Sequence, residues 1–143
     1  MAEFVSWKNV YSIGIRLVDD QHKYLLDLTN DLYASCIEGG GAAKERFRQT
    51  VKATVEYVGV HFATEELLMH RINYPDITAH KHEHKMFVQQ VLANVKDFES
   101  GQVYTPNAFV RFLRDWILEH VAQSDKKFGD YLIQIKKDGN LRI

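Results

Sequence analysis

Apolar residues recur at steps of three and four in four stretches of the chain, the spacing that keeps one face of an α-helix buried. These stretches predict helices over residues 20–37, 42–69, 76–98 and 106–133. Helices of this length joined by short connections are typical of an antiparallel up-down four-helix bundle. We therefore predict an all-α fold, and at 143 residues the chain has the size of a single domain, 1–143.

Helix-breaking residues separate the four stretches. Glycines at 39–41 follow the first helix, and Pro75 interrupts the chain after the second because the residue before a proline avoids the helical region. Thr105 and Pro106 predict an N-cap and a first-turn proline for the fourth helix. Asp19 predicts the N-cap of the first helix.

The segment before the first helix has a different pattern, in which apolar and polar residues alternate. Alternation of this kind predicts an extended segment with one buried side. The apolar positions are Tyr11, Ile13, Ile15 and Leu17. Because no second such segment exists to pair with it, residues 1–18 are expected to form an extended N-terminal arm on the helices, anchored by Trp7. Residues 136–143 are expected to form a frayed tail.

Histidine and carboxylate side chains lie on the inward-facing stripes of these helices. His61 and Glu65 are four residues apart, as are His80 and His84, and four residues advance about 400° around a helix, so each pair shares a face. The first and fourth helices carry further candidates on their stripes. In chain order the whole set is His22, His61, Glu65, His80, His84, His120 and Asp125.

Imidazole and carboxylate groups are ligands of transition metals, and the set as a whole predicts a metal centre. A single histidine on an apolar face is more often a hydrogen-bonded core residue than a ligand. Burying five imidazoles and a carboxylate together without a metal would cost several kcal/mol or more in lost hydration. The two remaining histidines, His70 and His82, are expected at the surface.

The spacing of His120 and Asp125 does not suit a regular helix. Five residues turn about 500°, which leaves the two side chains about 140° apart. We predict either a local widening of the fourth helix between Val121 and Asp125, or a site broad enough to be contacted from two sides.

Four spaced motifs in this order resemble the hemerythrin family, and the flanking segments IRLVDDQH, EELLMHRINYP and HKHEHKMF resemble its bacterial branch, the bacteriohemerythrins. The resemblance implies a non-heme di-iron centre. In it, two iron ions are bridged by a solvent-derived oxygen and by Glu65 and Asp125. One iron would have six ligands, including His80, His84 and His120, and the other would have five, including His22 and His61.

The same resemblance implies that the five-coordinate iron binds O2 reversibly, and that NO or a small anion such as azide could take the same place. The apolar residues expected around the bound O2 are Leu25, Phe62, Trp116, Ile117 and Val121. The alternative for all five is ordinary core packing, which for Leu25 or Val121 alone is equally favoured. The nitrogen-rich ligand set differs from the ferritin-like di-iron oxidases, whose Glu-x-x-His pairs are absent from this sequence.

Composition narrows the classes of partner. The 18 basic and 19 acidic residues give a formal charge of -1, without the basic excess that binding to nucleic acid uses, so no nucleic-acid partner is expected. No apolar run approaches the about 20 residues that cross a bilayer, and the N-terminus lacks the pattern of a signal peptide. We expect a cytoplasmic protein with no membrane partner. Cys36 is the only cysteine, so the chain can form no internal disulfide.

These features favour an O2 carrier for storage, delivery or scavenging, and not an enzyme. A sensor of O2, NO or redox state acting through a partner is a second hypothesis, disfavoured because these 143 residues contain no output module, unless the chain is an excised domain. A di-iron enzyme acting on peroxide or NO is a third. It would need a polar or proton-donating group near the open iron, and the predicted pocket supplies none except the Trp116 ring edge.

Overall fold

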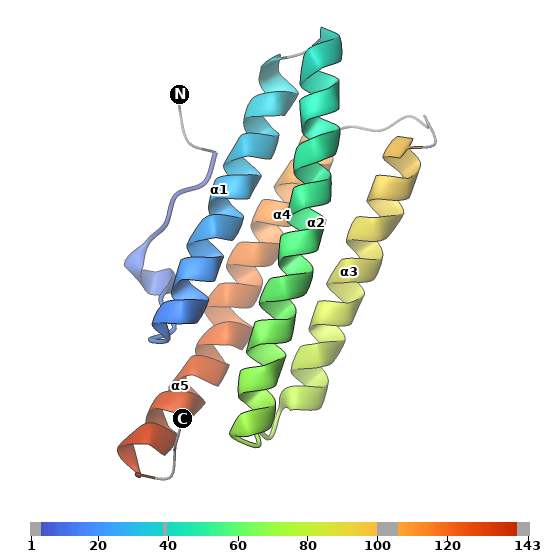
Figure 1. Ribbon diagram of the computed structural model, residues 1–143. Coiled ribbons are helices and arrows are strands. Elements are labelled where there is room, and N and C mark those ends of the chain that lie inside the picture. Colours follow the sequence, from blue (N-terminus) through green and yellow to red (C-terminus); the bar gives the residue numbers. More distant parts are fainter. Residues whose placement is uncertain (1–3, 39, 100–105, 140–143) are drawn as a thin grey trace.

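The computed structural model describes residues 4–38, 40–99 and 106–139, and its described part is helical with no strand. In chain order the elements are η1 (Asn9–Tyr11), α1 (Arg16–Glu38), α2 (Gly40–Arg71), α3 (Ile77–Glu99), α4 (Pro106–His120), η2 (Val121–Asp125) and α5 (Lys126–Lys137). Figure 1 shows α1, α2, α3 and the continuous α4–η2–α5 unit running alternately up and down. The predicted antiparallel four-helix bundle is confirmed.

The predicted apolar stripes form the core. On α1 the residues Leu25, Leu26, Thr29 and Leu32 are buried, and on α2 the stripe from Phe47 to Glu65 is buried as well. α1 packs on α2 and α4, and α2 packs on α3. Buried apolar side chains form two clusters. A main core contains Leu32, Phe87 and Leu113 among others, and a smaller one contains Met69, Tyr74 and Phe128.

The start of the first helix is wrong in the prediction. α1 begins at Arg16 and not at Asp20, which places Leu17 on its surface with 54% of the residue exposed. Asp19 does not cap the helix. Its carboxylate accepts hydrogen bonds from the Ser12 hydroxyl at 2.6 Å and the Ile13 N–H at 2.9 Å. The alternation of apolar and polar residues continues to Leu17, which made the predicted helix start too late. The Asp19 carboxylate binds the preceding arm and does not cap the helix.

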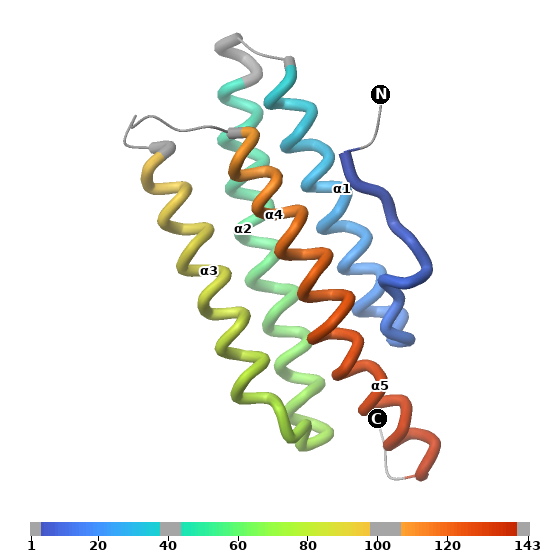
Figure 2. The backbone as a smooth tube through the Cα atoms, turned by 180° about the vertical axis from the view of Figure 1, so that it is seen from behind, coloured from blue at the N-terminus to red at the C-terminus, as the bar shows by residue number. Residues whose placement is uncertain are grey.

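The arm lies along α1, as Figure 2 shows. The Val5 N–H donates to the Asn30 side-chain oxygen at 2.9 Å, and the Asn30 amide donates back to the Val5 carbonyl at 2.8 Å. Trp7 is half-buried and packs against the main core, in agreement with the predicted anchor. The arm also contains one short turn, η1, which the extended pattern did not predict.

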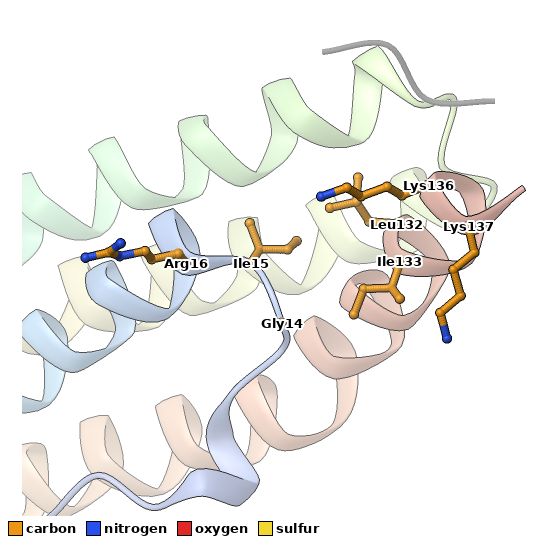
Figure 3. A pocket seen from close by; sticks show the side chains of 7 residues that line it. All are labelled: Gly14, Ile15, Arg16, Leu132, Ile133, Lys136 and Lys137. Carbon is orange, nitrogen blue, oxygen red and sulfur yellow. The ribbon is translucent and has the colours of Figure 1, made fainter. Parts of the chain in front are cut away.

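Two glycines let the arm approach the last helix closely. Gly14 has φ +84°, a conformation that L side chains rarely adopt, and a Cβ there would lie 2.5 Å from Cδ1 of Ile133. A Cβ on Gly129 would collide with the backbone oxygen of Ile13. A groove of about 850 Å³ remains between the two segments. Figure 3 shows the side chains that line it. Its lining residues are Gly14, Ile15, Arg16, Leu132, Ile133, Lys136 and Lys137.

The remaining boundaries lie close to the predicted ones. α3 begins at Ile77, one residue after the predicted start, and α5 continues to Lys137, so the predicted frayed tail is helical at Lys136 and Lys137. The N-cap predicted at Thr105 and the tail residues 140–143 lie outside the described residues. Within the described part of the chain, no helix is both long and apolar enough to span a bilayer.

Candidate metal centre

All seven predicted ligand residues meet inside the bundle, and none is more than 5% exposed. α1 supplies His22, α2 supplies His61 and Glu65, α3 supplies His80 and His84, α4 supplies His120, and η2 supplies Asp125. Each helix therefore brings at least one polar group to the same interior point. The other two histidines, His70 and His82, are exposed as predicted.

Three histidines and one carboxylate form a first group on the side of α3 and α4. His84 Nε2 lies 3.1 Å from His120 Nε2. Oδ1 of Asp125 lies 3.0 Å from His80 Nε2 and 3.1 Å from His120 Nε2. One ligand atom from each of the four residues lies within 4.8 Å of the others, close enough to surround a single cation.

A second group lies on the side of α1 and α2. His61 Nε2 is 2.6 Å from Oε1 of Glu65, and His22 Nε2 is 3.7 Å from the same oxygen. His22 Nε2 also lies 3.0 Å from Oδ2 of Asp125. These four residues again have ligand atoms within 4.8 Å of one another, so Asp125 belongs to both groups.

Both carboxylates face the two groups at once. Asp125 presents Oδ1 to His80 and His120, and Oδ2 to His22. Glu65 presents Oε1 to His61 and Oε2 to His80, the latter at 3.6 Å from His80 Nε2. An arrangement of this kind suits two cations side by side with a carboxylate oxygen for each.

The donor atoms converge without satisfying one another. Both oxygens of Glu65, both oxygens of Asp125, and Nε2 of His22 and His80 are buried, and their close contacts lack the geometry of hydrogen bonds. Leaving a buried polar group unpaired costs about 1–3 kcal/mol, and more when the group is charged. A bound cation would satisfy all of these atoms together, so the residues present fit a metal centre of imidazole and carboxylate ligands.

The helix widens where the sequence predicts it. Val121–Asp125 forms a π turn, η2, between α4 and α5. A π turn closes i to i+5 hydrogen bonds, so a residue five positions along the chain returns to the same side of the helix. His120 and Asp125 can therefore face the same interior point, which resolves the mismatch of their spacing.

The buried histidines and carboxylates of the site shift one another's pKa values. Burial acts to lower the pKa of His22 and His80, but the nearby carboxylates of Asp125 and Glu65 outweigh it and raise each pKa to about 9. Burial would raise the pKa of Glu65, but its histidine neighbours lower it to about 2. The pKa of Asp125 is also lowered, because its histidine neighbours outweigh its burial. Burial lowers the pKa of His84 to about 3.

Two residues that the sequence analysis did not predict accept hydrogen bonds from the outer nitrogens of candidate ligand histidines. Nδ1 of His61 donates to the side-chain oxygen of Gln21 at 2.6 Å, and Nδ1 of His84 donates to Oε2 of Glu66 at 2.9 Å. Gln21 precedes His22 and Glu66 follows Glu65, yet each contacts a histidine of another helix. The sequence signal that could have identified both residues is that each is a polar residue next to a candidate ligand.

The five predicted pocket residues belong to the main core or pack against it. Leu25, Phe62, Ile117 and Val121 are buried and Trp116 is half-buried. The Phe62 ring stacks on His84 with centroids 3.7 Å apart, and the Trp116 ring stacks on His120 at 4.4 Å. The two aromatic rings therefore cover the α3 and α4 imidazoles on the side of the main core.

Comparisons with known proteins agree with this arrangement. The sequence model described as the hemerythrin HHE cation binding domain matches residues 13–132. A bacteriohemerythrin from Methylococcus capsulatus is 31% identical over 122 residues, which cover 85% of this chain and 91% of that protein. A hemerythrin-like protein from Naegleria gruberi is 28% identical over 127 residues, covering 89% of this chain and 92% of that one.

Solved structures give the same result. The crystal structure of a wild-type hemerythrin has a TM-score of 0.82 and 30% identity to this chain, covering 89% of it and 96% of the solved chain. Sequence, fold and the converging histidine and carboxylate residues point in one direction, and the chain belongs to the hemerythrin family.

Proposed function

We propose that this protein binds O2 reversibly at a non-heme centre of two iron ions, for O2 storage, delivery or scavenging. The observation that carries the proposal is the pair of four-residue ligand groups that share Asp125. Membership of the hemerythrin family supports iron as the metal. Once bound, iron would supply the electrons that hold O2 and take them back on its release.

The seven ligand residues have unequal roles in this proposal. His80, His84 and His120 would hold one iron, His22 and His61 would hold the other, and Glu65 and Asp125 would bridge them. The second iron would have one protein ligand fewer, which leaves a position for O2. The same position would accept NO or a small anion such as azide.

The protein around the centre would keep it dry and rigid. Phe62 and Trp116 lie flat against His84 and His120, which restricts rotation of these imidazoles. Leu25, Ile117 and Val121 are at most 4% exposed and would form an apolar wall that admits O2 and restricts water. Exclusion of water would slow autoxidation, in which the iron loses electrons and can no longer bind O2.

The proposal is tested by metal content and by the visible spectrum. Two irons per chain are expected in protein reconstituted with ferrous iron under anaerobic conditions. Addition of O2 is expected to produce a visible charge-transfer band that disappears completely on deoxygenation, over repeated cycles. Fewer than two irons per chain, or sustained consumption of O2, would overturn the proposal.

The same experiment separates a carrier from a di-iron enzyme, and a measurement of affinity for a partner protein separates it from a sensor. A di-iron enzyme acting on peroxide or NO would consume substrate with turnover, whereas a carrier binds no more than one O2 for each centre. A sensor would bind O2 reversibly as well, but its binding would change the affinity for a partner protein.

A further inference from the structure

The outer nitrogens of two facing imidazoles meet different chemical groups. His61, on α2, has a neutral amide as its partner, because Nδ1 donates to the side-chain oxygen of Gln21 at 2.6 Å. His84, on α3, has a carboxylate, because Nδ1 donates to Oε2 of Glu66 at 2.9 Å. The two partners have nearly the same shape and differ in charge.

The orientation of the Gln21 amide is set by its surroundings. Its nitrogen lies 3.5 Å from the hydroxyl of Thr64 and donates to it, and that hydroxyl donates to the Val60 carbonyl at 2.9 Å. The amide oxygen is therefore the atom that faces His61. The α1–α2 side therefore presents a neutral hydrogen-bond acceptor to His61.

Carboxylates are concentrated on the opposite side of the centre. Glu66 is largely shielded, with 25% of its side chain exposed. Oε2 of Glu83 lies 3.9 Å from Nδ1 of His120, and Oε1 of Glu83 accepts from the Ser124 hydroxyl at 2.9 Å. Two of the imidazoles in the α3–α4 group thus have an anionic neighbour at the outer nitrogen.

The charge of such a partner alters the metal through its ligand. A ligand imidazole whose outer N–H is held by a carboxylate gains electron density and binds a more highly charged metal ion better. Hydrogen bonding outside the ligands is one of the ways in which a protein sets the potential of bound iron. A neutral amide holds the ring in the same orientation with a smaller effect on its electron density.

We infer that Glu66 and Gln21 are positioning residues that make the two iron sites electronically unequal, favouring ferric iron beside His84 and ferrous iron beside His61. This inference rests on the proposed function, because it assumes two irons held by the assigned ligands. The iron beside His61 is the one proposed to bind O2, and it does so in the ferrous state. The amide at Gln21 would help to keep it in that state.

The test exchanges the two partners. Glu66→Gln removes one charge, Gln21→Glu adds one, and the double variant restores the net charge of the wild type while reversing its placement. The potential of each iron is measured in the iron-loaded proteins by titration with one-electron mediators. Mössbauer spectra then assign the ferric ion of the half-reduced protein to the six- or five-coordinate site.

The wild type is expected to hold the ferric ion at the six-coordinate site beside His84. Glu66→Gln is expected to ease reduction of that iron by about tenfold in the ratio of reduced to oxidised forms, which is a rise of about 59 mV for one electron. Gln21→Glu is expected to lower the potential of the other iron by a similar factor. In the double variant the ferric ion is expected to move to the five-coordinate site.

Surface variants with the same charge changes serve as controls. Glu56→Gln on α2 and Gln89→Glu on α3 alter exposed residues and are expected to leave both potentials unchanged. If Glu66→Gln lowers the iron content, Gln21→Glu alone decides. Shifts no larger than those of the controls overturn this inference while leaving O2 binding intact, whereas a wild type without two irons overturns the proposed function itself.

Discussion

At the scale of single residues, Phe62 stacks more closely on a site histidine than Trp116 does, at 3.7 Å against 4.4 Å between ring centroids. Its ring lies parallel to that of His84, with an angle of 5° and centroids 3.7 Å apart, and it also approaches Trp116 at 6.0 Å. A side chain in this position both fills the core and covers a ligand. These two roles can be separated by comparison with a phenylalanine elsewhere in the bundle.

Phe62→Ala is expected to cost about 3–5 kcal/mol of the free energy of unfolding and to shorten the lifetime of the oxygenated protein, because water reaches the centre. Phe47→Ala is the matched control, since Phe47 is 3% exposed and lies about 22 Å along α2 from Phe62. It should cost similar stability without changing the lifetime. Denaturant unfolding and the decay of the visible band measure the two effects.

The candidate ligand pairs spaced four residues apart could be predicted from the sequence, because that spacing places both side chains on one face of their own helix. His61 and Glu65 are an example, since a step of four needs no knowledge of the neighbouring helices. Gln21 and Glu66 could not be predicted in this way. Each acts on a histidine of another helix, and one sequence does not give the relative rotation of two packed helices.

At the scale of elements, the π turn η2 is where local geometry departs from the regular helix. Such a turn fits one more residue into roughly the arc of an α turn. The phase of the helix after Asp125 is therefore close to that of a regular helix with one residue fewer. The His120 and Asp125 spacing conflicts with 3.6 residues per turn, so the sequence predicted either a widening or a broad site, and the structure has the widening.

Deleting Ala122, an exposed residue within η2, is expected to convert the π turn into an α turn and to preserve both helical content and iron binding. Deleting Asp115, an exposed residue of α4, should instead abolish iron binding, because His120 rotates by about 100° relative to the start of α4. Circular dichroism and iron content per chain test the pair. Loss of iron in the first variant would show that the π turn itself is required.

The contact between the arm and α5 gives a second prediction at this scale. Gly129→Ala is expected to destabilise the protein by roughly 1–3 kcal/mol, because the new methyl group meets the Ile13 backbone. Gly59→Ala is expected to stabilise it by about 0.5–1 kcal/mol, since nothing lies within 4 Å of that site and alanine favours the helix. Chemical denaturation measures the change in the free energy of unfolding of each variant. Changes of the same sign would contradict the prediction.

The boundaries of elements were less predictable than their existence. Leu17 continues an alternating pattern and was expected in the arm, but it lies on the surface of α1. Alternation over a few residues cannot be distinguished from the exposed first turn of a helix. The role of Asp19 likewise depends on where the arm lies, which local sequence does not specify.

At the scale of the whole molecule, the candidate centre takes side chains from all four helices of the bundle. Removal of iron is expected to lower the melting temperature markedly, because buried carboxylates and imidazoles lose their cation. Differential scanning calorimetry of loaded and stripped protein measures the difference. An unchanged melting temperature would contradict the assignment of Glu65 and Asp125 as buried bridges.

The stripped protein should also be sensitive to alkaline pH. The pKa of His22 and of His80 is raised from 6.5 to about 9 in the folded chain, so both add stability that is complete below pH 6.5 and is lost as the pH rises to about 9. His84, with its pKa lowered to about 3, is neutral over this range in the folded protein. The melting temperature of the stripped protein is expected to fall from pH 6.5 to 9, and that of the loaded protein to change less.

The π turn has a consequence for anyone who wishes to build this centre into a new scaffold. A design that places the seven side chains on four ideal α-helices with the natural spacing would turn Asp125 more than a third of a turn away from His120. The designer must either reproduce the irregular turn Val121–Asp125 or shorten the spacing by one residue. The geometry of such a centre therefore depends on the backbone conformation as well as on the identity of the ligands.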